Sequence, residues 1–288
     1  MHEHHEPPGP SGPSPAHGEW RRRFAAEARE ERPDLATLCL LVGAEGDPEL
    51  GQDGLDAAEI ELDRLAGLLP YGARSPHEWA RALAGLLGGR LDFHGTPGDY
   101  RRLDSSLLPA VLRRRRGLPI LLSVVWLEVA RRAGAPVYGV ALPGHFVVGF
   151  GDPAEQVLAD PFAGGVPLSP DDAGLLVTGA TGGRLEPSML TPADPLRIVL
   201  RILNNIRAWA AARPECSAVA LWAVELSLLL PAHPARLRYE RAELLVQRGD
   251  FPAGAAELEA YAEVVDAVEP VAAERVRDMA KAARAMLN

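Results

Sequence analysis

The sequence has little cysteine and no long hydrophobic run. These two features argue against a disulfide-stabilised protein and against a membrane-spanning one. Its two cysteines, Cys39 and Cys216, lie in apolar helical contexts, and no Cys-x-x-Cys pair occurs among the 288 residues. A disulfide framework is therefore not indicated, and this usage fits a reducing cytoplasm. No apolar run approaches the ~18 residues that a membrane-spanning helix needs. We expect a cytoplasmic protein with no membrane partner.

The chain also lacks an excess of positive charge. Lys and Arg number 30 against 39 Asp and Glu, which gives a formal net charge of −9. Proteins that bind nucleic acids usually carry a basic stripe or a basic balance. The dense basic run here, Arg113 to Arg116, leads directly into a helix start. We interpret this run as a solvated helix end or loop and expect no nucleic-acid partner.

The N-terminal segment lacks the apolar stretch of a secretory signal. Residues 1–18 are rich in Pro, Gly and His, a composition typical of disorder. We expect a disordered tail over 1–18. Its histidines, His2, His4 and His5, could bind a metal only weakly, and we predict no metal site and no cofactor.

What the sequence does contain is helical periodicity on both sides of a short block of strands. In residues 54–70 a helix is expected that stops before Pro70 and carries one apolar side, formed by Ile60, Leu62, Leu65, Leu68 and Leu69. A second helix is expected to begin at Ser75, with Pro76 in its first turn and Glu78 completing a capping box. Residues 90–106 resemble a loop. An apolar helix from Pro119 to about Arg132 is then followed by three short strands.

From about residue 192 the chain is predicted to form five helices. Residues 238–270 have the rhythm of a tetratricopeptide repeat, an apolar helix, a Gly249-Asp250-Phe251 turn and a second helix. Gly254 stands where that repeat usually has Ala. One and a half repeats are too few to stand alone, so we expect them to pack on the preceding domain.

A histidine and an aspartate stand at the ends of two neighbouring predicted strands. His145 follows Pro143 and Gly144 at the start of one strand, and Asp160 ends the next and opens the turn Asp-Pro-Phe-Ala-Gly-Gly. Such a pair can hold a base and the carboxylate that orients it. Two simpler interpretations stay open. His145 could bond its own strand neighbours, and Asp160 could cap its turn through an Asx bond.

Three motifs in this block resemble the SirB-type proteins, a bacterial branch of the transglutaminase-like superfamily. They are the helix start Arg-Arg-Gly-Leu-Pro-Ile-Leu-Leu-Ser at 115–123, the strand start Gly-Val-Ala-Leu-Pro-Gly-His-Phe at 139–146, and the Asp-Pro-Phe-Ala-Gly-Gly turn at 160–165. The resemblance covers about residues 34–270 and is dense over 112–165. A related module occurs in an F-box protein branch, where it implies contact with a substrate or partner in ubiquitin ligation.

The resemblance implies an α+β fold in three parts. These are a helical N-terminal part, a papain/transglutaminase-like core of a buried helix and a small antiparallel sheet, and an all-α tetratricopeptide-like C-terminal region. We expect the transglutaminase-like SirB-type domain over 19–190 and the helical domain over 191–288.

The resemblance also points to a missing nucleophile. In the superfamily a Cys begins the buried helix, whose N-terminus lowers the thiol pKa. Measured back from Gly134, the Cys position falls at Ile120, and residues 117–123 contain no cysteine. Ser123 is the nucleophile type in that stretch, but an alkoxide is far harder to generate than a thiolate. The alternative is that Ser123 is a small residue on a packed helix face that returns its hydroxyl to a backbone carbonyl.

The remaining motif residues are expected to shape a pocket rather than to react: Arg116, Gly117, Pro119, Gly144, Phe146, Pro161 and Phe162. We interpret Arg116 and Gly117 as structural and Gly144 as permitting a close backbone approach. The family usually has Asn-Ser-x-Leu before the arginine run. This chain has Asp104-Ser105-Ser106-Leu107 there, a change expected to alter any polar network near the pocket.

Three functions are compatible with these features. The one we favour is a non-catalytic transglutaminase-like protein that binds a protein or peptide partner in a regulatory role, because the Cys is missing and helical repeats often bind peptides. The second is a hydrolase or acyl transferase that uses Ser123, or a water activated by His145, with Asp160. The third is a His/Asp metal or small-ligand site, for which two ligands are too few. The oligomeric state stays open.

Overall fold

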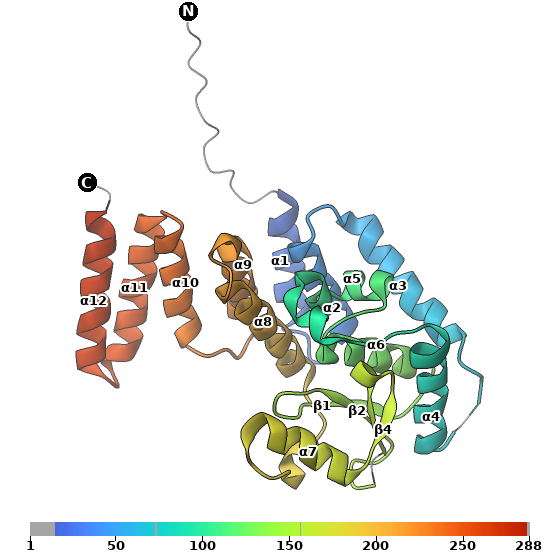
Figure 1. Ribbon diagram of the computed structural model, residues 1–288. Helices are drawn as coiled ribbons and strands as arrows, with labels where there is room; N and C mark the ends of the chain where they lie inside the picture. The colour runs from blue at the N-terminus through green and yellow to red at the C-terminus, as the bar shows by residue number, and fades with distance from the viewer. Residues whose placement is uncertain (1–14, 73, 156, 287–288) are drawn as a thin grey trace, which may run out of the picture.

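The computed structural model describes residues 15–72, 74–155 and 157–286 and shows a mostly helical molecule around one small antiparallel sheet (Figure 1). The predicted α+β architecture, with a buried helix, a small sheet and an all-α C-terminal region, is confirmed. Helix α1 (Pro15–Glu27) begins inside the segment expected to be a disordered tail. Proline suits this place because the first helical turn needs no hydrogen bond from its nitrogen. Residues 1–14 lie outside the described residues.

Three further helices precede the central block, α2 (Leu35–Gly46), α3 (Gly51–Gly67) and α4 (Pro76–Leu83). The predicted capping box of α4 is confirmed. The apolar side expected for α3 is wrong in part, because Ile60 is 66% exposed while Leu62 is buried. Two residues apart on a helix means about 200° of rotation, so both cannot face the core. The buried side of α3 consists of Leu55, Ala58, Leu62 and Leu65.

The segment between α4 and the buried helix has more regular structure than the sequence predicts. Helix α4 continues into a π-helical turn, η1 (Ala84–Arg90), and the expected loop contains two 3-10 helices, η2 (Pro97–Arg101) and η3 (Leu103–Ser106). Helix α5 (Leu108–Arg114) follows. The predicted buried helix is α6 (Pro119–Arg132), and its bounds agree with the prediction.

The sheet has four antiparallel strands in the order β1 (Val137–Val140), β2 (Val147–Phe150), β3 (Val157–Asp160) and β4 (Val166–Leu168). Strand β4 and helix α7 (Pro170–Thr181) have no counterpart among the predicted elements. Side chains alternate between the two faces, as they do in any strand. Val148 and Phe150 join the main core with α6, whereas Val147 and Leu158 pack with Ala173 of α7. In Figure 1 the sheet therefore lies between α6 and α7.

The five predicted C-terminal helices are present. They are α8 (Pro195–Ala211), α9 (Ser217–Leu229), α10 (Arg236–Gln247), α11 (Phe251–Asp266) and α12 (Pro270–Ala285), with the short 3-10 helices η5 (Pro187–Leu190) and η6 (Pro214–Cys216) between elements. Helices α10 to α12 stand side by side in Figure 1. None of the described helices is long and apolar enough to cross a membrane.

These five helices belong to two separate hydrophobic cores. Ile202 of α8 and Trp222 of α9 are buried in the main core, together with α6 and the sheet. Helices α10 to α12 have a core of their own, which includes Leu258 and Val276. The domain division at 190/191 stays a prediction, but the buried sides of α8 and α9 join both helices to the central block.

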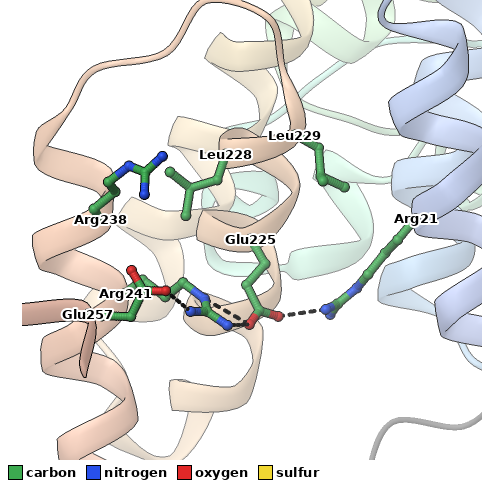
Figure 2. Close-up of a pocket in the computed structure, with 7 residues that line it drawn as sticks. All are labelled: Arg21, Glu225, Leu228, Leu229, Arg238, Arg241 and Glu257. Atoms are coloured by element: carbon green, nitrogen blue, oxygen red, sulfur yellow. Dashed lines mark hydrogen bonds and ion pairs between the residues drawn. The ribbon is translucent and has the colours of Figure 1, made fainter. Parts of the chain in front are cut away.

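A chain of ion pairs links the two cores and lines a cavity of about 280 Å³ (Figure 2). Arg21 of α1 donates to Oε2 of Glu225 on α9 at 2.6 Å. The other oxygen of Glu225 accepts from Arg241 of α10 at 3.0 Å, and Arg241 also binds Glu257 of α11. These half-buried contacts hold the first repeat helices against the central block.

Candidate functional site

The sheet brings the predicted His–Asp pair together. Because β2 runs antiparallel to β3, the start of β2 lies beside the end of β3. His145 comes just before β2, and its Nε2 lies 2.9 Å from Oδ2 of Asp160. The two side chains are only 12% and 10% exposed, so water screens their interaction weakly. The catalytic role of the pair stays a prediction.

The contact between the two side chains is close but is not an aligned hydrogen bond. Nε2 of His145 is buried and has no hydrogen-bond partner of suitable direction among the described residues. Oδ1 of Asp160 accepts from the backbone N–H of Phe162 at 2.9 Å. Asp160 thus forms the Asx-type cap of its turn and faces His145 with its other oxygen. Asp160 therefore lies beside the histidine and also caps its turn, as the two interpretations from the sequence each expected.

Two aromatic rings border the histidine. The ring of Phe162 lies 6.1 Å from that of His145, edge to face. The ring of Tyr100 also lies 6.1 Å from that of Phe162. Partial burial, together with the negative charge of Asp160, raises the pKa of Tyr100. The sequence analysis did not single out Tyr100, because it lies in a segment that resembled a loop.

Arg201 of α8 holds the segment just before β2 by two hydrogen bonds. Its Nη2 donates to the backbone carbonyls of Leu142 at 2.8 Å and of His145 at 2.7 Å. Its guanidinium also lies 5.7 Å from the centre of the Phe146 ring. The sequence analysis missed this residue. The sequence feature that could have identified it is an arginine within the apolar pattern of this helix, where Ile198 and Ile202 are buried.

The start of α6 offers no exposed nucleophile. Ile120, at the position expected for the family Cys, is buried. Ser123 is fully buried, and its hydroxyl donates to the backbone carbonyl of Phe146 at 3.2 Å. This is the geometry of the alternative interpretation, although the returned bond crosses to the strand rather than to the helix itself. The use of Ser123 as a nucleophile stays a prediction, and it would require this hydrogen bond to break.

The other motif residues hold loops in place around the pair. Arg116 donates to the backbone carbonyl of Asp92 at 2.6 Å and to its carboxylate at 2.9 Å. Gly117 packs against Val111, where a Cβ would lie 2.8 Å from a methyl group. Pro119 occupies the first turn of α6.

The glycine before His145 and the turn after Asp160 are also tightly packed. Gly144 has a φ of +72°, and a Cβ there would lie 2.6 Å from that of Ala180. The predicted close backbone approach is therefore present. Pro161 is buried and begins the 3-10 helix η4 (Pro161–Ala163). Phe146 is buried in the main core.

A buried carboxylate organises the segment before α6. Oδ2 of Asp99 accepts from the backbone N–H and the hydroxyl of Thr96, and Oδ1 accepts from Ser105 at 2.9 Å and Arg114 at 3.2 Å. Burial alone would raise the pKa of Asp99, but these hydrogen bonds hold that pKa below its ordinary value. The carbonyl of Ser105 accepts from the N–H of Leu118, the N-cap of α6.

The arginine run lies at the C-terminal end of α5, and Arg113 and Arg115 are exposed, as the interpretation of a solvated helix end expects. Three of its arginines also have acidic partners that the local pattern did not predict. Arg113 lies 3.5 Å from Asp47, Arg114 binds Asp99, and Arg116 binds Asp92. The run ties three loops to the start of α6.

Metal-ligand side chains do not gather in the part of the chain that the structure describes. No group of three His, Cys, Asp or Glu side chains there could hold a metal ion. His145 and Asp160 are two such groups, and a zinc site needs three protein ligands or more.

We expect Cys39 to resist alkylation in the native protein. Cys39 lies on α2 and is buried, and burial, with the negative charges of Glu128 and Asp34, raises the pKa of its thiol. The thiolate is the reactive form. Brief iodoacetamide treatment followed by peptide mass spectrometry should modify partly exposed Cys216 and leave Cys39 free. Both should react in urea, and native modification of Cys39 would contradict its burial.

The fold and the site agree with one class of protein. The chain belongs to the transglutaminase-like superfamily, whose family model matches residues 53–204, more than half of the chain. A tetratricopeptide repeat model matches residues 206–288. Within this class the chain is a member of the UPF0162 protein family.

Curated relatives carry that family assignment. A UPF0162 protein of Xylella fastidiosa strain Temecula1 is 32% identical over 242 residues, which cover 82% of this chain and 85% of the relative. The corresponding protein of strain 9a5c is 32% identical over 219 residues, covering 74% and 78%. F-box only protein 21 of the mouse is 36% identical over 77 residues, which cover 27% of this chain and 12% of that protein.

Proposed function

We propose that this chain is a non-catalytic, SirB-type member of the family that binds a protein or peptide partner in a regulatory role. A transglutaminase-like domain joined to tetratricopeptide repeats fits a protein-binding role. Repeats of this kind present extended surfaces to peptides in many proteins. The proposal goes further in assigning no chemistry to the retained His145 and Asp160.

The observation that carries the proposal is the state of the nucleophile position. Ile120 is buried there, and the hydroxyl of Ser123 donates to the carbonyl of Phe146 inside the core. A serine nucleophile must lie within hydrogen-bond reach of its base and face the substrate. A fully buried hydroxyl that already has an acceptor in the strand meets neither condition. The His–Asp contact is then a structural link between β2 and β3.

The ion-paired junction of Figure 2 supports the binding role. Glu225 binds arginines from α1 and α10 at once, so the repeats have a defined orientation toward the central block. A preformed surface loses less conformational entropy when a partner binds.

A fluorophosphonate probe tests the absence of serine chemistry. We expect the full-length protein to show no labelling above that of heat-denatured protein. The variants are Ser123→Ala and, as a matched control, Ser227→Ala. Ser227 is equally buried and donates its hydroxyl to the carbonyl of Ala223 at 2.7 Å. Labelling that Ser123→Ala abolishes and Ser227→Ala preserves would contradict the proposal and establish the acyl-transfer alternative.

The binding half of the proposal needs a separate measurement. A protein captured by the full chain should be purified and titrated against the wild type and Ser123→Ala by calorimetry. We expect saturable binding of equal strength to both. A failure of every purified candidate to bind saturably would count against a binding role.

A further inference from the structure

A cavity of about 280 Å³ lies between α8 and the residues that connect β1 to β2. Its walls come from Ala141, directly after β1, and Phe146, directly before β2, from the segment of η5 up to the N-cap of α8, and from the first two turns of α8. Phe146 and Arg201 line it, and Arg201 also donates to the carbonyl of His145. The cavity is therefore a neighbour of the pair and is built from different side chains.

Two arginines on one face of α8 supply its charge. Arg197 and Arg201 both line the cavity, and residues four apart on a helix lie on the same face, one turn from each other. Among the residues that the structure describes, neither side chain has an acidic partner. Burial accordingly lowers the pKa of Arg201, with Tyr100 acting in the opposite direction. A half-buried guanidinium that lines a cavity and has no acidic hydrogen-bond partner favours an anion beside it.

The acidic residue on the cavity wall, Asp194, makes its hydrogen bonds to the backbone rather than to the side chain of either arginine. Oδ1 of Asp194 accepts from the backbone N–H groups of Leu196 at 2.9 Å and Arg197 at 3.2 Å, as the N-cap of α8. In the cavity of Figure 2, two of the three lining arginines have acidic partners. Arg21 and Arg241 in Figure 2 each bind glutamates.

The rest of the lining is mostly apolar, with the hydroxyl side chains of Ser188 and Thr191 among it, and the volume is small. Phe146, Met189 and Ile198 supply the apolar surface. The volume is close to the lower end of the range for ligand sites, about 300–1,000 Å³. This volume is enough for one terminal residue of a peptide, an apolar side chain with its carboxylate.

We propose that this cavity binds the C-terminal carboxylate and last apolar side chain of a peptide partner, with Arg197 and Arg201 holding the carboxylate. The guanidinium fork matches the two carboxylate oxygens in geometry and charge. This assignment rests on the proposed peptide-binding function and names the part of the partner that is recognised. It also places the bound end beside His145, through the bond from Arg201 to the carbonyl of that residue.

Fluorescence polarisation with synthetic peptides tests the proposal on the full-length chain. The probes are fluorescein-labelled pentapeptide pools, each with one defined last residue and a free C-terminus, and the same pools with an amidated C-terminus. We expect pools that end in an apolar residue to bind, and amidation to weaken them about tenfold or more. Amidated pools with an internal Asp or Glu test whether a side-chain carboxylate can substitute, and we expect these not to bind.

Variants of the chain localise the effect. Arg197→Gln should weaken the free-acid pools about tenfold. This exposed side chain makes no hydrogen bond or ion pair with the residues that the structure describes, so the fold should be unchanged, as thermal melting should verify. Arg201→Lys keeps the charge and removes the fork, and a similar loss is expected. Arg184→Gln, an exposed arginine outside the cavity, should bind as the wild type does.

Three results would overturn the proposal: equal binding of acid and amide pools, binding of no pool, or wild-type affinity in both Arg197→Gln and Arg201→Lys. If a purified protein partner still binds the chain saturably in that case, the proposed function stands and only the carboxylate site is wrong. If neither peptides nor proteins bind, both are wrong.

Discussion

The Asp99→Asn variant is expected to lose about 3 kcal/mol of unfolding free energy at pH 7. Asp99 is buried and accepts hydrogen bonds from Thr96, Ser105 and Arg114. A hydrogen bond to a charged acceptor contributes about 1.5–3 kcal/mol to the unfolding free energy. A buried donor left without an acceptor adds a desolvation penalty. The amide of asparagine turns an N–H₂ group toward at least one of these donors. Urea denaturation of the two proteins measures the difference.

The same variant should show a characteristic dependence on pH. The pKa of Asp99 is lowered in the folded state, so its contribution is fully present above the unfolded value, about 3.9. It is lost as the pH falls through the lower folded pKa. We expect the difference between wild type and Asp99→Asn to be constant from pH 5 to pH 7 and to shrink in acid below the unfolded value.

Asp104→Asn is the matched control, because Asp104 is exposed in the same segment. It should change the unfolding free energy by no more than about 0.5 kcal/mol, as most surface substitutions do. Equal losses in the two variants, or a loss in Asp99→Asn that persists unchanged in strong acid, would contradict the assigned network. The control also tests whether the departure from the family pattern at Asp104 matters for stability.

Gly88→Ala is expected to cost about 3 kcal/mol or more. Gly88 lies in η1 against the turn that follows Asp160, and a Cβ there would lie 1.8 Å from the carbonyl oxygen of Gly164. Both partners are backbone, so no side-chain rotation relieves the clash, and overpacking of this kind displaces one of the segments. Thermal and urea unfolding measure the loss.

The neighbouring glycine provides the control. At Gly89 the nearest atom to an added Cβ is the carbonyl oxygen of Ala84 at 3.7 Å, an ordinary contact. Gly89→Ala should therefore be neutral or slightly stabilising, by up to about 1 kcal/mol, because alanine favours the helix. If the two variants unfold alike, η1 and the turn after Asp160 are not in contact as described.

The two variants bear on the site because both segments position the pair. The turn from Pro161 to Gly165 holds Asp160, and Gly165 donates to the carbonyl of Asp160 at 2.7 Å. The Asp99 network holds Leu118 at the start of α6 through the carbonyl of Ser105. Disruption of the turn or of the Asp99 network would therefore displace a segment that surrounds His145.

Local features were predictable from the sequence wherever the controlling interactions lie within a few residues. The capping box of Ser75 and Glu78, the bounds of α6 and the five C-terminal helices depend on such interactions, and the structure has them. The His–Asp pair was also predictable, since successive antiparallel strands bring the start of one to the end of the other. The absent Cys at Ile120 is a property of the sequence itself.

Other features depend on segments far apart in the chain. Local periodicity suggested that Ile60 faces the core, and the packing direction of α3 decides otherwise. The acidic partners of the arginine run, Asp47, Asp99 and Asp92, also come from other segments, so no local pattern predicts them.

The sequence by itself determined that this is a helix–sheet–helix chain with a His–Asp pair and no thiol at the start of its buried helix, because these follow from residue identity and short-range geometry. Only the tertiary structure decided that the hydroxyl of Ser123 is bound to the strand and that Arg197 and Arg201 face a small cavity beside His145. Both features depend on which residues of a distant segment lie within a few ångströms, and the sequence pattern alone does not contain such distances.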